Sequence, residues 1–191
     1  MDKKDILEIF ERMGAILRGH FLLTSGRHSD TYMQCAKLFV EPKLAKALCE
    51  ELCEKLKGVE VDLVASPAVG GIIMGYQMAQ ILSTKNLFFE RQDGVMALRR
   101  GFAIEKGAKV LVVEDVVTMG GSVREVIEQC KKRGADVRAV ASIVDRSGGK
   151  VDFGLPFYSL LSMDIISYEA GQCPLCERGI PAVKPGSRDL K

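Results

Sequence analysis

Two acidic residues followed by a short run of small and hydroxyl-bearing residues form the most chemically suggestive segment of this chain. Glu114 and Asp115 end an apolar stretch, and residues 118–122 (Thr-Met-Gly-Gly-Ser) follow closely. Adjacent glycines let the backbone turn tightly and bring amide groups close to an anion, and a following helix adds the partial positive charge of its N-terminus. Two carboxylates would repel a phosphate unless they face sugar hydroxyls or a divalent cation. The segment therefore predicts a phosphate cradle with two acids at its mouth; the alternative is an ordinary polar strand end followed by a turn.

Two common phosphate-binding motifs are absent from the sequence. No G-x-x-x-x-G-K-S/T segment occurs, and no G-x-G-x-x-G segment follows an apolar strand. The predicted cradle therefore differs from those of P-loop and dinucleotide-binding proteins.

A mainly parallel β-sheet is predicted to position the cradle. Short apolar strands alternate with helices, and strands that are apolar on both sides imply a sheet covered on both faces. In such α/β folds ligands bind at the carboxyl ends of the strands, where the acidic pair lies. We expect strands at 62–66, 86–90, 109–113, 137–145 and 157–163, and helices at 42–57, 72–82 and 121–133.

The first part of the chain is expected to add a helix and two extended pieces. Apolar residues up to Leu17 recur at helical spacing and predict a first helix that ends near Gly19. Two short extended pieces should follow, around a turn at residues 25–27. No linker or internal repeat divides the sequence, so we expect a single domain over residues 1–191.

The composition excludes several classes of protein. The 191 residues carry 27 Lys and Arg against 25 Asp and Glu, a net charge of +2, so the chain lacks the broad charge of proteins that bind nucleic acid or anionic membranes non-specifically. No apolar stretch reaches the roughly 20 residues of a membrane-spanning helix, and the N-terminus has no signal-peptide pattern. We expect a cytoplasmic protein whose six cysteines are reduced thiols.

The C-terminal part contains a Cys-Pro-Leu-Cys sequence at Cys173–Cys176. Two thiolates at this spacing could bind zinc, but a structural zinc site needs four ligands, and His20 and His28 lie far away in the sequence. We therefore expect a structural turn here, with an incomplete or dimer-bridging metal site as the alternative.

The strand, the acidic pair and the Thr-x-Gly-Gly-Ser segment together resemble the phosphoribosyl pyrophosphate signature of the type I phosphoribosyltransferases. Other segments resemble the orotate branch of that family, and they follow the expected order along nearly the whole chain. These segments are FLLTSGRHSDTY (21–32), SPAVGG (66–71), FFERQDGVMALRRGF (88–102), IVDRSGG (143–149) and CPLCERGIPAVKPGS (173–187). The resemblance implies the type I α/β fold, with a core at about 42–165 and a small hood formed by about 1–40 plus the C-terminal segment.

For phosphoribosyl pyrophosphate the resemblance implies two binding turns. The acids would hold the ribose 2- and 3-hydroxyls, because carboxylates accept hydrogen bonds from hydroxyls, and the amides after them would wrap the 5-phosphate. The SPAVGG turn would receive the pyrophosphate, although by itself a turn with two glycines is an ordinary structural feature. The implied residues are Glu114, Asp115, Val116, Val117, Thr118, Met119, Gly120, Gly121 and Ser122, together with Ala68, Val69, Gly70 and Gly71.

For orotate the resemblance implies an arginine and a hood. Arg146 would pair with the orotate carboxylate, which suits a planar guanidinium; the alternative is a surface salt bridge with neighbouring Asp145. Tyr32 would belong to the hood or could equally be a core residue. The implied orotate-binding residues are Thr118, Arg146, Thr24, Ser25, Arg27 and Tyr32.

The implied reaction is displacement of pyrophosphate from C1 of phosphoribosyl pyrophosphate by N1 of orotate, which gives orotidine 5-monophosphate in pyrimidine biosynthesis. The transition state should resemble an oxocarbenium ion, so catalysis would rest on positioning and on stabilising the leaving pyrophosphate. Mg²⁺ is the implied cofactor. Because Mg²⁺ would be held mainly by substrate oxygens, we name no protein side chain as its ligand.

A basic segment between Arg91 and Lys106 has little apolar periodicity and predicts a hairpin or mobile loop. The resemblance implies a lid that closes over the pyrophosphate and reaches the neighbouring subunit's site, hence a homodimer. The family's usual Lys- and His-containing segment is shortened here, and Gly70 stands where a lysine is frequent. The implied catalytic residues are Arg91, Arg99, Arg100 and Asp115, and we predict that Arg91→Ala lowers turnover without affecting folding; Arg99 and Arg100 could instead be strand residues that face solvent.

Two other functions fit the same fold. A purine phosphoribosyltransferase would share the phosphoribosyl loop, but its base carries no carboxylate for Arg146. A phosphoribosyl pyrophosphate-sensing regulator would need a nucleic-acid surface, which the charge balance does not favour. We therefore expect small-molecule substrates, and neither nucleic acid nor membrane as a partner.

Overall fold

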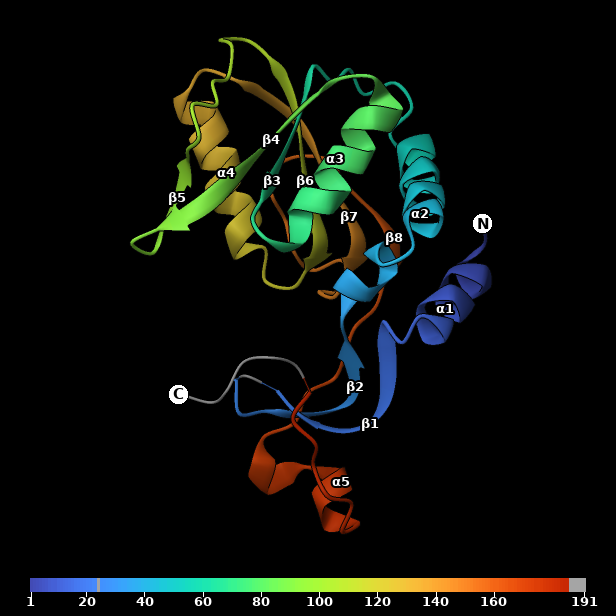
Figure 1. The fold of residues 1–191 in the computed structure, drawn as a ribbon. Coiled ribbons are helices and arrows are strands. Elements are labelled where there is room, and N and C mark those ends of the chain that lie inside the picture. Colours follow the sequence, from blue (N-terminus) through green and yellow to red (C-terminus); the bar gives the residue numbers. More distant parts are fainter. Residues whose placement is uncertain (24, 186–191) are drawn as a thin grey trace.

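A twisted six-stranded sheet forms the centre of the computed structural model, which describes residues 1–23 and 25–185 (Figure 1). The strand order is β5-β4-β3-β6-β7-β8, and every neighbouring pair is parallel except β4 and β5. The strands are β3 (Leu63–Pro67), β4 (Lys85–Gln92), β5 (Val95–Leu98), β6 (Lys109–Val117), β7 (Asp136–Asp145) and β8 (Phe157–Ser162). The predicted mainly parallel α/β sheet is confirmed.

Helices cover both faces of this sheet. Helices α2 (Pro42–Lys55) and α3 (Gly70–Leu82) lie on one face, and α4 (Gly121–Lys132) lies on the other (Figure 1). Each face has its own buried apolar cluster, one centred on α2 and α3 and one on α4. The central strands are apolar on both sides because both of their faces are buried. Among the described residues, no helix is both long and apolar enough to cross a membrane.

The first helix is shorter than the sequence indicated. Helix α1 spans Lys3–Arg12, and Asp2 caps it through reciprocal hydrogen bonds with Asp5. Leu17 and Gly19, which we expected in or at the end of this helix, instead lie in strand β1 (Ile16–Leu22). The helix stops because Gly14 adopts a positive φ of 63° and the chain then pairs with β2 (His28–Met33), a non-local contact that overrides the helical spacing.

A small second sheet stands at the carboxyl edge of the main sheet. It consists of the antiparallel pair β1 and β2, and the C-terminal segment runs alongside it with short helices η2 (Ala170–Gln172) and α5 (Pro174–Glu177) (Figure 1). The amide of His28 donates to the carbonyl of Tyr168 at 2.8 Å, and the amide of Leu22 donates to the carbonyl of Val183 at 2.9 Å. We call this unit, the described residues 16–23, 25–33 and 165–185, the hood. Helix α1 and the 3₁₀ helix η1 (Cys35–Phe39) pack on the main core. The exact division of the chain into hood and core stays a prediction.

Candidate active site

The acidic pair lies near the end of β6, beside the turn that follows β3. Strands β3 and β6 are neighbours, so their carboxyl ends open at the same edge of the sheet. A Cβ atom on Gly70 would lie only 2.7 Å from Oδ1 of Asp115, and one on Gly71 would lie 3.2 Å from Oε1 of Glu114. The turn thus approaches the acids so closely that a side chain at Gly70 would force the Asp115 carboxylate to shift. The two segments predicted to bind one ligand therefore lie next to each other at this edge.

Burial shapes the chemistry of the acidic pair. Asp115 is 9% exposed, and Glu114 is half-buried beside it. Burial raises the pKa of Glu114, and the neighbouring carboxylate of Asp115 raises it further. Burial also raises the pKa of Asp115. Two buried carboxyl groups in contact resist ionising together, so the pair favours ligands that donate hydrogen bonds or bring positive charge.

The predicted phosphate cradle is an open turn at the N-terminus of α4. Gly120 has a φ of 75°, and a Cβ atom there would lie 2.7 Å from the ring of Phe153, so this position needs glycine for conformation and for space. Met119 is 84% exposed, and Thr118 and Gly121 are also exposed. The backbone of the turn is therefore open to solvent where the positive end of the helix dipole lies.

The second turn has the same construction at the N-terminus of α3. Ala68 is half-buried, Val69 is 81% exposed, and Gly70 is exposed at the first position of the helix. The peptide bond between Ala68 and Val69 is cis. Two helix N-termini thus open side by side at the end of the sheet, a geometry that suits a ligand with two phosphate-bearing ends.

Arg146 follows β7, the strand next to β6, and its amide donates to the carbonyl of Val117 at 2.7 Å. Within the described residues, its side chain forms no salt bridge, and its buried Nε has no hydrogen-bond partner. Burial lowers the pKa of the guanidinium, while Cys35 and Tyr32 raise it. A buried guanidinium nitrogen without a partner is costly, so the group is suited to receive an anion.

The alternative of an Arg146–Asp145 salt bridge is wrong. Asp145 is 3% exposed and accepts hydrogen bonds from its own loop instead: from the Ser147 amide at 2.8 Å, the Ser147 hydroxyl at 2.6 Å and the Gly149 amide at 2.8 Å. The Ser162 hydroxyl adds a fourth at 3.0 Å. Burial favours the protonated acid, but these hydrogen bonds prevail and lower the pKa of Asp145. Asp145 therefore shapes the loop that presents Arg146, a positioning role that we did not predict.

The predicted orotate-binding residues of the hood differ in burial and in hydrogen bonding. Tyr32 lies on β2, half-buried, with its ring 5.8 Å from that of Phe21 and its hydroxyl donating to Gln34 at 3.1 Å. Ser25 is exposed in the turn. Arg27 is not free: its Nε donates to the Ser167 hydroxyl at 2.8 Å, and its other nitrogens bond the Ser167 carbonyl and the Glu169 carboxylate. Thr24 lies outside the described residues. Arg27 thus ties the hood turn to the C-terminal segment in this conformation.

The predicted lid begins as a hairpin, which agrees with one of the two expected forms. Strands β4 and β5 pair antiparallel at the sheet edge, and residues 99–108 connect β5 to β6. Arg91 donates to the Gly94 carbonyl at 2.7 Å and to Glu125 at 2.9 Å, and Arg100 forms two 2.8 Å hydrogen bonds to Glu90.

Arg99 differs from the other two arginines of the lid. It is exposed, and its side chain has no hydrogen bond or ion pair to any part of the chain that the structure describes. Arg99 and Arg100 follow β5 and do not belong to it, so the alternative that they are strand residues is wrong. Of the three predicted lid cations, Arg99 is the one available to a ligand without breaking an ion pair.

A depression of about 670 Å³ elsewhere on the molecule does not compete with this site. Asp62, Ser83 and Lys106 are among its lining residues, at the amino ends of β3, β4 and β6. Among the described residues, no helix begins at that edge of the sheet, whereas α3 and α4 both begin at the carboxyl edge. We therefore place the candidate active site between the two turns, the acidic pair and Arg146.

Comparison with known proteins identifies the fold and its family. A family model described as a phosphoribosyl transferase domain matches residues 41–171. An orotate phosphoribosyltransferase of Caldanaerobacter subterraneus subsp. tengcongensis is 56% identical over 190 residues, which cover 100% of both chains, and that of Thermotoga maritima is 56% identical over 97% of this chain and 100% of its own. The chain belongs to the orotate phosphoribosyltransferase family.

Solved structures agree with this family assignment. The crystal structure of orotate phosphoribosyltransferase from Aeropyrum pernix matches with a TM-score of 0.72 and 25% identity, over 82% of this chain and 93% of that one. An adenine phosphoribosyltransferase from Thermoanaerobacter pseudethanolicus matches with a TM-score of 0.62 at 18% identity, over 70% of this chain and 88% of that one, and so shares the fold alone. The resemblance to type I phosphoribosyltransferases read from the sequence is confirmed for fold and family.

Proposed function

We propose that this chain transfers the ribose 5-phosphate group of phosphoribosyl pyrophosphate to N1 of orotate, releasing pyrophosphate and orotidine 5-monophosphate in pyrimidine biosynthesis. Membership of the orotate phosphoribosyltransferase family supports this proposal. The single observation that carries the choice of base is Arg146, whose buried Nε lacks a partner among the described residues, beside the ribose-binding candidates. A permanently charged, planar donor matches the carboxylate that orotate carries and purines lack.

The chain's own residues would position the two substrates. Glu114 and Asp115 would accept from the ribose hydroxyls, and the amides at the start of α4 would donate to the 5-phosphate. The turn before α3 would receive the pyrophosphate, so that the helix dipole offsets the charge that builds on the leaving group. Arg146 would fix the orotate ring with N1 toward the ribose.

Mg²⁺ is the proposed cofactor, and the donor set fits it. Two carboxyl groups in contact provide hard oxygen atoms, and burial raises the pKa of both, so a cation beside them would favour their ionised forms. Glu114 and Asp115 would hold the ion through water or through the ribose oxygens. Bound there, Mg²⁺ would neutralise part of the pyrophosphate charge.

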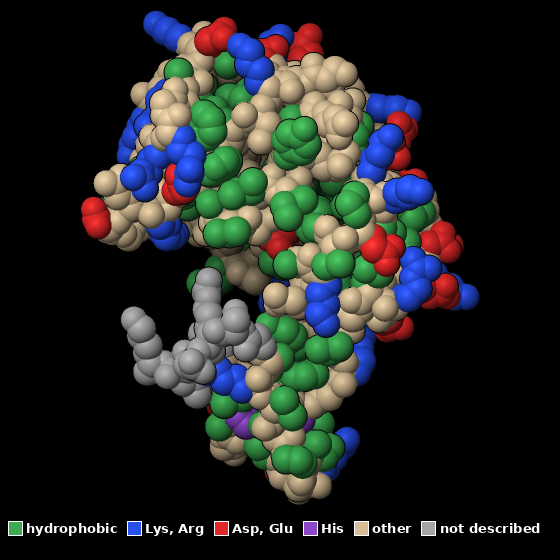
Figure 2. All heavy atoms as spheres, in the orientation of Figure 1, with side chains coloured by type: hydrophobic (Ala, Val, Ile, Leu, Met, Phe, Trp, Pro, Cys, Tyr) green, Lys and Arg blue, Asp and Glu red, His purple; other side chains and the backbone are tan. Residues whose placement is uncertain are grey.

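A homodimer is the proposed assembly. Exposed apolar side chains gather on and beside α3, including Val69, Ile73 at 56% and Tyr76 at 66% exposure, and Figure 2 shows apolar surface over this helix. Contiguous apolar surface of this kind marks an interaction site. The patch adjoins the turn that would hold pyrophosphate, so a partner seated there could bring its Arg99 loop to the site. Sedimentation at several protein concentrations tests the dimer.

The test of function is a base panel. The protein is incubated with Mg²⁺, phosphoribosyl pyrophosphate and either orotate, hypoxanthine or uracil, and pyrophosphate release is followed. We expect release with orotate and none above background with hypoxanthine. Turnover with hypoxanthine instead would favour a purine enzyme, and no turnover with any base would favour the regulator. We expect the reaction to take place in the cytoplasm, which the absence of disulfides among the six cysteines supports.

A further inference from the structure

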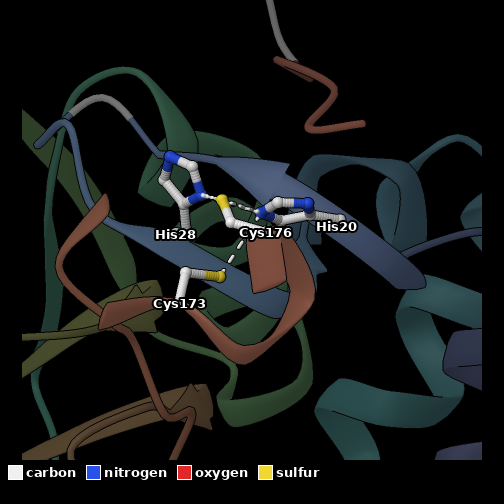
Figure 3. A group of neighbouring side chains, drawn as sticks. All are labelled: His20, His28, Cys173 and Cys176. Atoms are coloured by element: carbon white, nitrogen blue, oxygen red, sulfur yellow. Dashed lines mark hydrogen bonds between the residues drawn. The ribbon is translucent and has the colours of Figure 1, made fainter. Parts of the chain in front are cut away.

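Four potential metal ligands converge in the hood, away from the proposed active site (Figure 3). His20 comes from β1 and His28 from β2, while Cys173 immediately precedes α5 and Cys176 lies within it. Their ligand atoms all lie within 4.8 Å of one another. The expectation that Cys173 and Cys176 have no further ligands nearby is therefore wrong, because the fold brings together residues about 150 positions apart in the chain.

The spacing of these atoms approaches that of a tetrahedral zinc site. Zn–S bonds of about 2.3 Å and Zn–N bonds of about 2.0–2.1 Å place tetrahedral ligand atoms about 3.4–3.8 Å apart. Nε2 of His20 lies 3.5 Å from Sγ of Cys173 and 3.8 Å from Sγ of Cys176, and Nδ1 of His28 lies 3.3 Å from Sγ of Cys176. The two ring nitrogens are 2.7 Å apart and would separate by roughly 0.6 Å around a metal.

Hydrogen bonding prepares His20 as a ligand. Its Nδ1 lies 2.7 Å from the carbonyl of Ile180, which can only accept, so Nδ1 carries the proton and Nε2 presents a lone pair to the cluster. Metal-bound histidines usually make this outer hydrogen bond. Without a metal, His28 and both cysteines compete for that single lone pair, whereas one ion would satisfy all four groups.

The surroundings indicate a structural ion. His20 is 4% exposed, His28 9% and Cys173 1%, and four protein ligands leave no open position for substrate. Two thiolates and two imidazoles favour zinc over hard ions such as Mg²⁺. Because a two-stranded hairpin is only marginally stable alone, a clamp between the hairpin and the C-terminal segment would fix the hood.

We propose that His20, His28, Cys173 and Cys176 bind one Zn²⁺ ion that joins β1, β2 and the C-terminal segment. The hood turn at residues 25–27 lies between the two histidines, so the ion would also fix this turn. If the proposed function holds, loss of zinc should therefore raise KM for orotate more than KM for phosphoribosyl pyrophosphate.

The test uses the full chain, purified under reducing conditions without chelator, and then supplied with one equivalent of Zn²⁺ if it is isolated metal-free. Elemental analysis should give one zinc per chain. Replacement by Co²⁺ should give the intense visible absorption of a tetrahedral ion together with thiolate-to-metal charge transfer. Sub-stoichiometric metal after reconstitution, stoichiometric iron in its place, or a Co²⁺ spectrum typical of six-coordinate oxygen ligands would each overturn the proposal.

Two variants distinguish loss of the metal site from a general effect of replacing a cysteine. Cys176→Ser removes the one exposed ligand, so we expect it to fold and to lose stoichiometric zinc and the charge-transfer band. Cys53→Ser, a half-buried cysteine on α2, should retain both. Full zinc retention in Cys176→Ser contradicts the ligand assignment. These readouts do not depend on activity, so a failed base panel would leave them valid, and absent zinc would leave the proposed function untouched.

Discussion

Replacing Glu114 by Gln should stabilise the ligand-free protein at neutral pH while it weakens the site. Burial and the adjacent Asp115 raise the pKa of Glu114 above its ordinary value of 4.5. The folded state therefore holds a proton that the unfolded chain releases. This favourable contribution is fully present below about pH 4.5 and is lost as the pH rises toward the folded pKa.

The magnitude follows from the proton count. While the folded state keeps one extra proton, the free energy of unfolding falls by about 1.4 kcal/mol per pH unit. Between pH 5 and pH 7 the wild type should thus lose up to about 3 kcal/mol through this pair. Gln keeps the acceptor oxygen that receives the Asp115 amide at 3.2 Å, but it has no proton to lose. The Gln side-chain amide can also still donate a hydrogen bond to Asp115, so most of the slope should vanish.

Urea unfolding at pH 5 and pH 7, without ligand or divalent ion, measures this slope. Glu8→Gln is the matched control, because Glu8 is exposed and, among the described residues, forms an ion pair with Lys4 on α1 alone. The slope of this variant should equal that of the wild type. With saturating phosphoribosyl pyrophosphate and Mg²⁺, the wild type should become more stable than Glu114→Gln, since the variant has lost a ligand contact. Equal slopes for the wild type and Glu114→Gln would falsify the picture of a protonated, buried pair.

Two further substitutions test the neighbouring turn and the lid. Gly70→Ala places a methyl group 2.7 Å from Asp115 Oδ1, so it should raise KM for phosphoribosyl pyrophosphate at least about tenfold, about 1.4 kcal/mol. In the control Gly171→Ala the methyl group meets no atom within 4 Å, and KM should not change. Equal KM values for the two variants in steady-state kinetics would contradict the close approach. Arg99→Ala should lower kcat more than Arg91→Ala, because Arg91 is bound to Glu125. The free energy of unfolding of both variants should lie within about 1 kcal/mol of that of the wild type. An unchanged kcat for Arg99→Ala would remove Arg99 from the lid.

Local pattern was enough to predict the centre of the fold. Strand β6 and helix α4 follow directly from an apolar run, two glycines and an amphipathic segment, and their bounds agree within a few residues. The acidic pair and the glycine turns could be located for the same reason. Because the carboxyl ends of parallel strands meet at one edge of a sheet, the sequence could also predict that the turns after β3 and β6 lie close together.

Contacts between distant parts of the chain could not be predicted in this way. Leu17 fits a helical spacing, but its pairing with Tyr32 across the hairpin decides its conformation. The partner of Arg27, in the C-terminal segment, leaves no local signal in the sequence. The same holds for the histidines that meet Cys173 and Cys176, because four ligands on three separate segments match no short motif.

The central claim is that Arg146 selects a base with a carboxylate, and the ratio of kcat/KM for orotate to that for uracil tests it most directly. Uracil lacks only that carboxylate. The wild type should strongly prefer orotate. In Arg146→Gln, kcat/KM for orotate should fall roughly 150-fold, about 3 kcal/mol, while kcat/KM for uracil should change little. A variant that loses activity toward both bases equally, and keeps the wild-type ratio, would contradict the assignment.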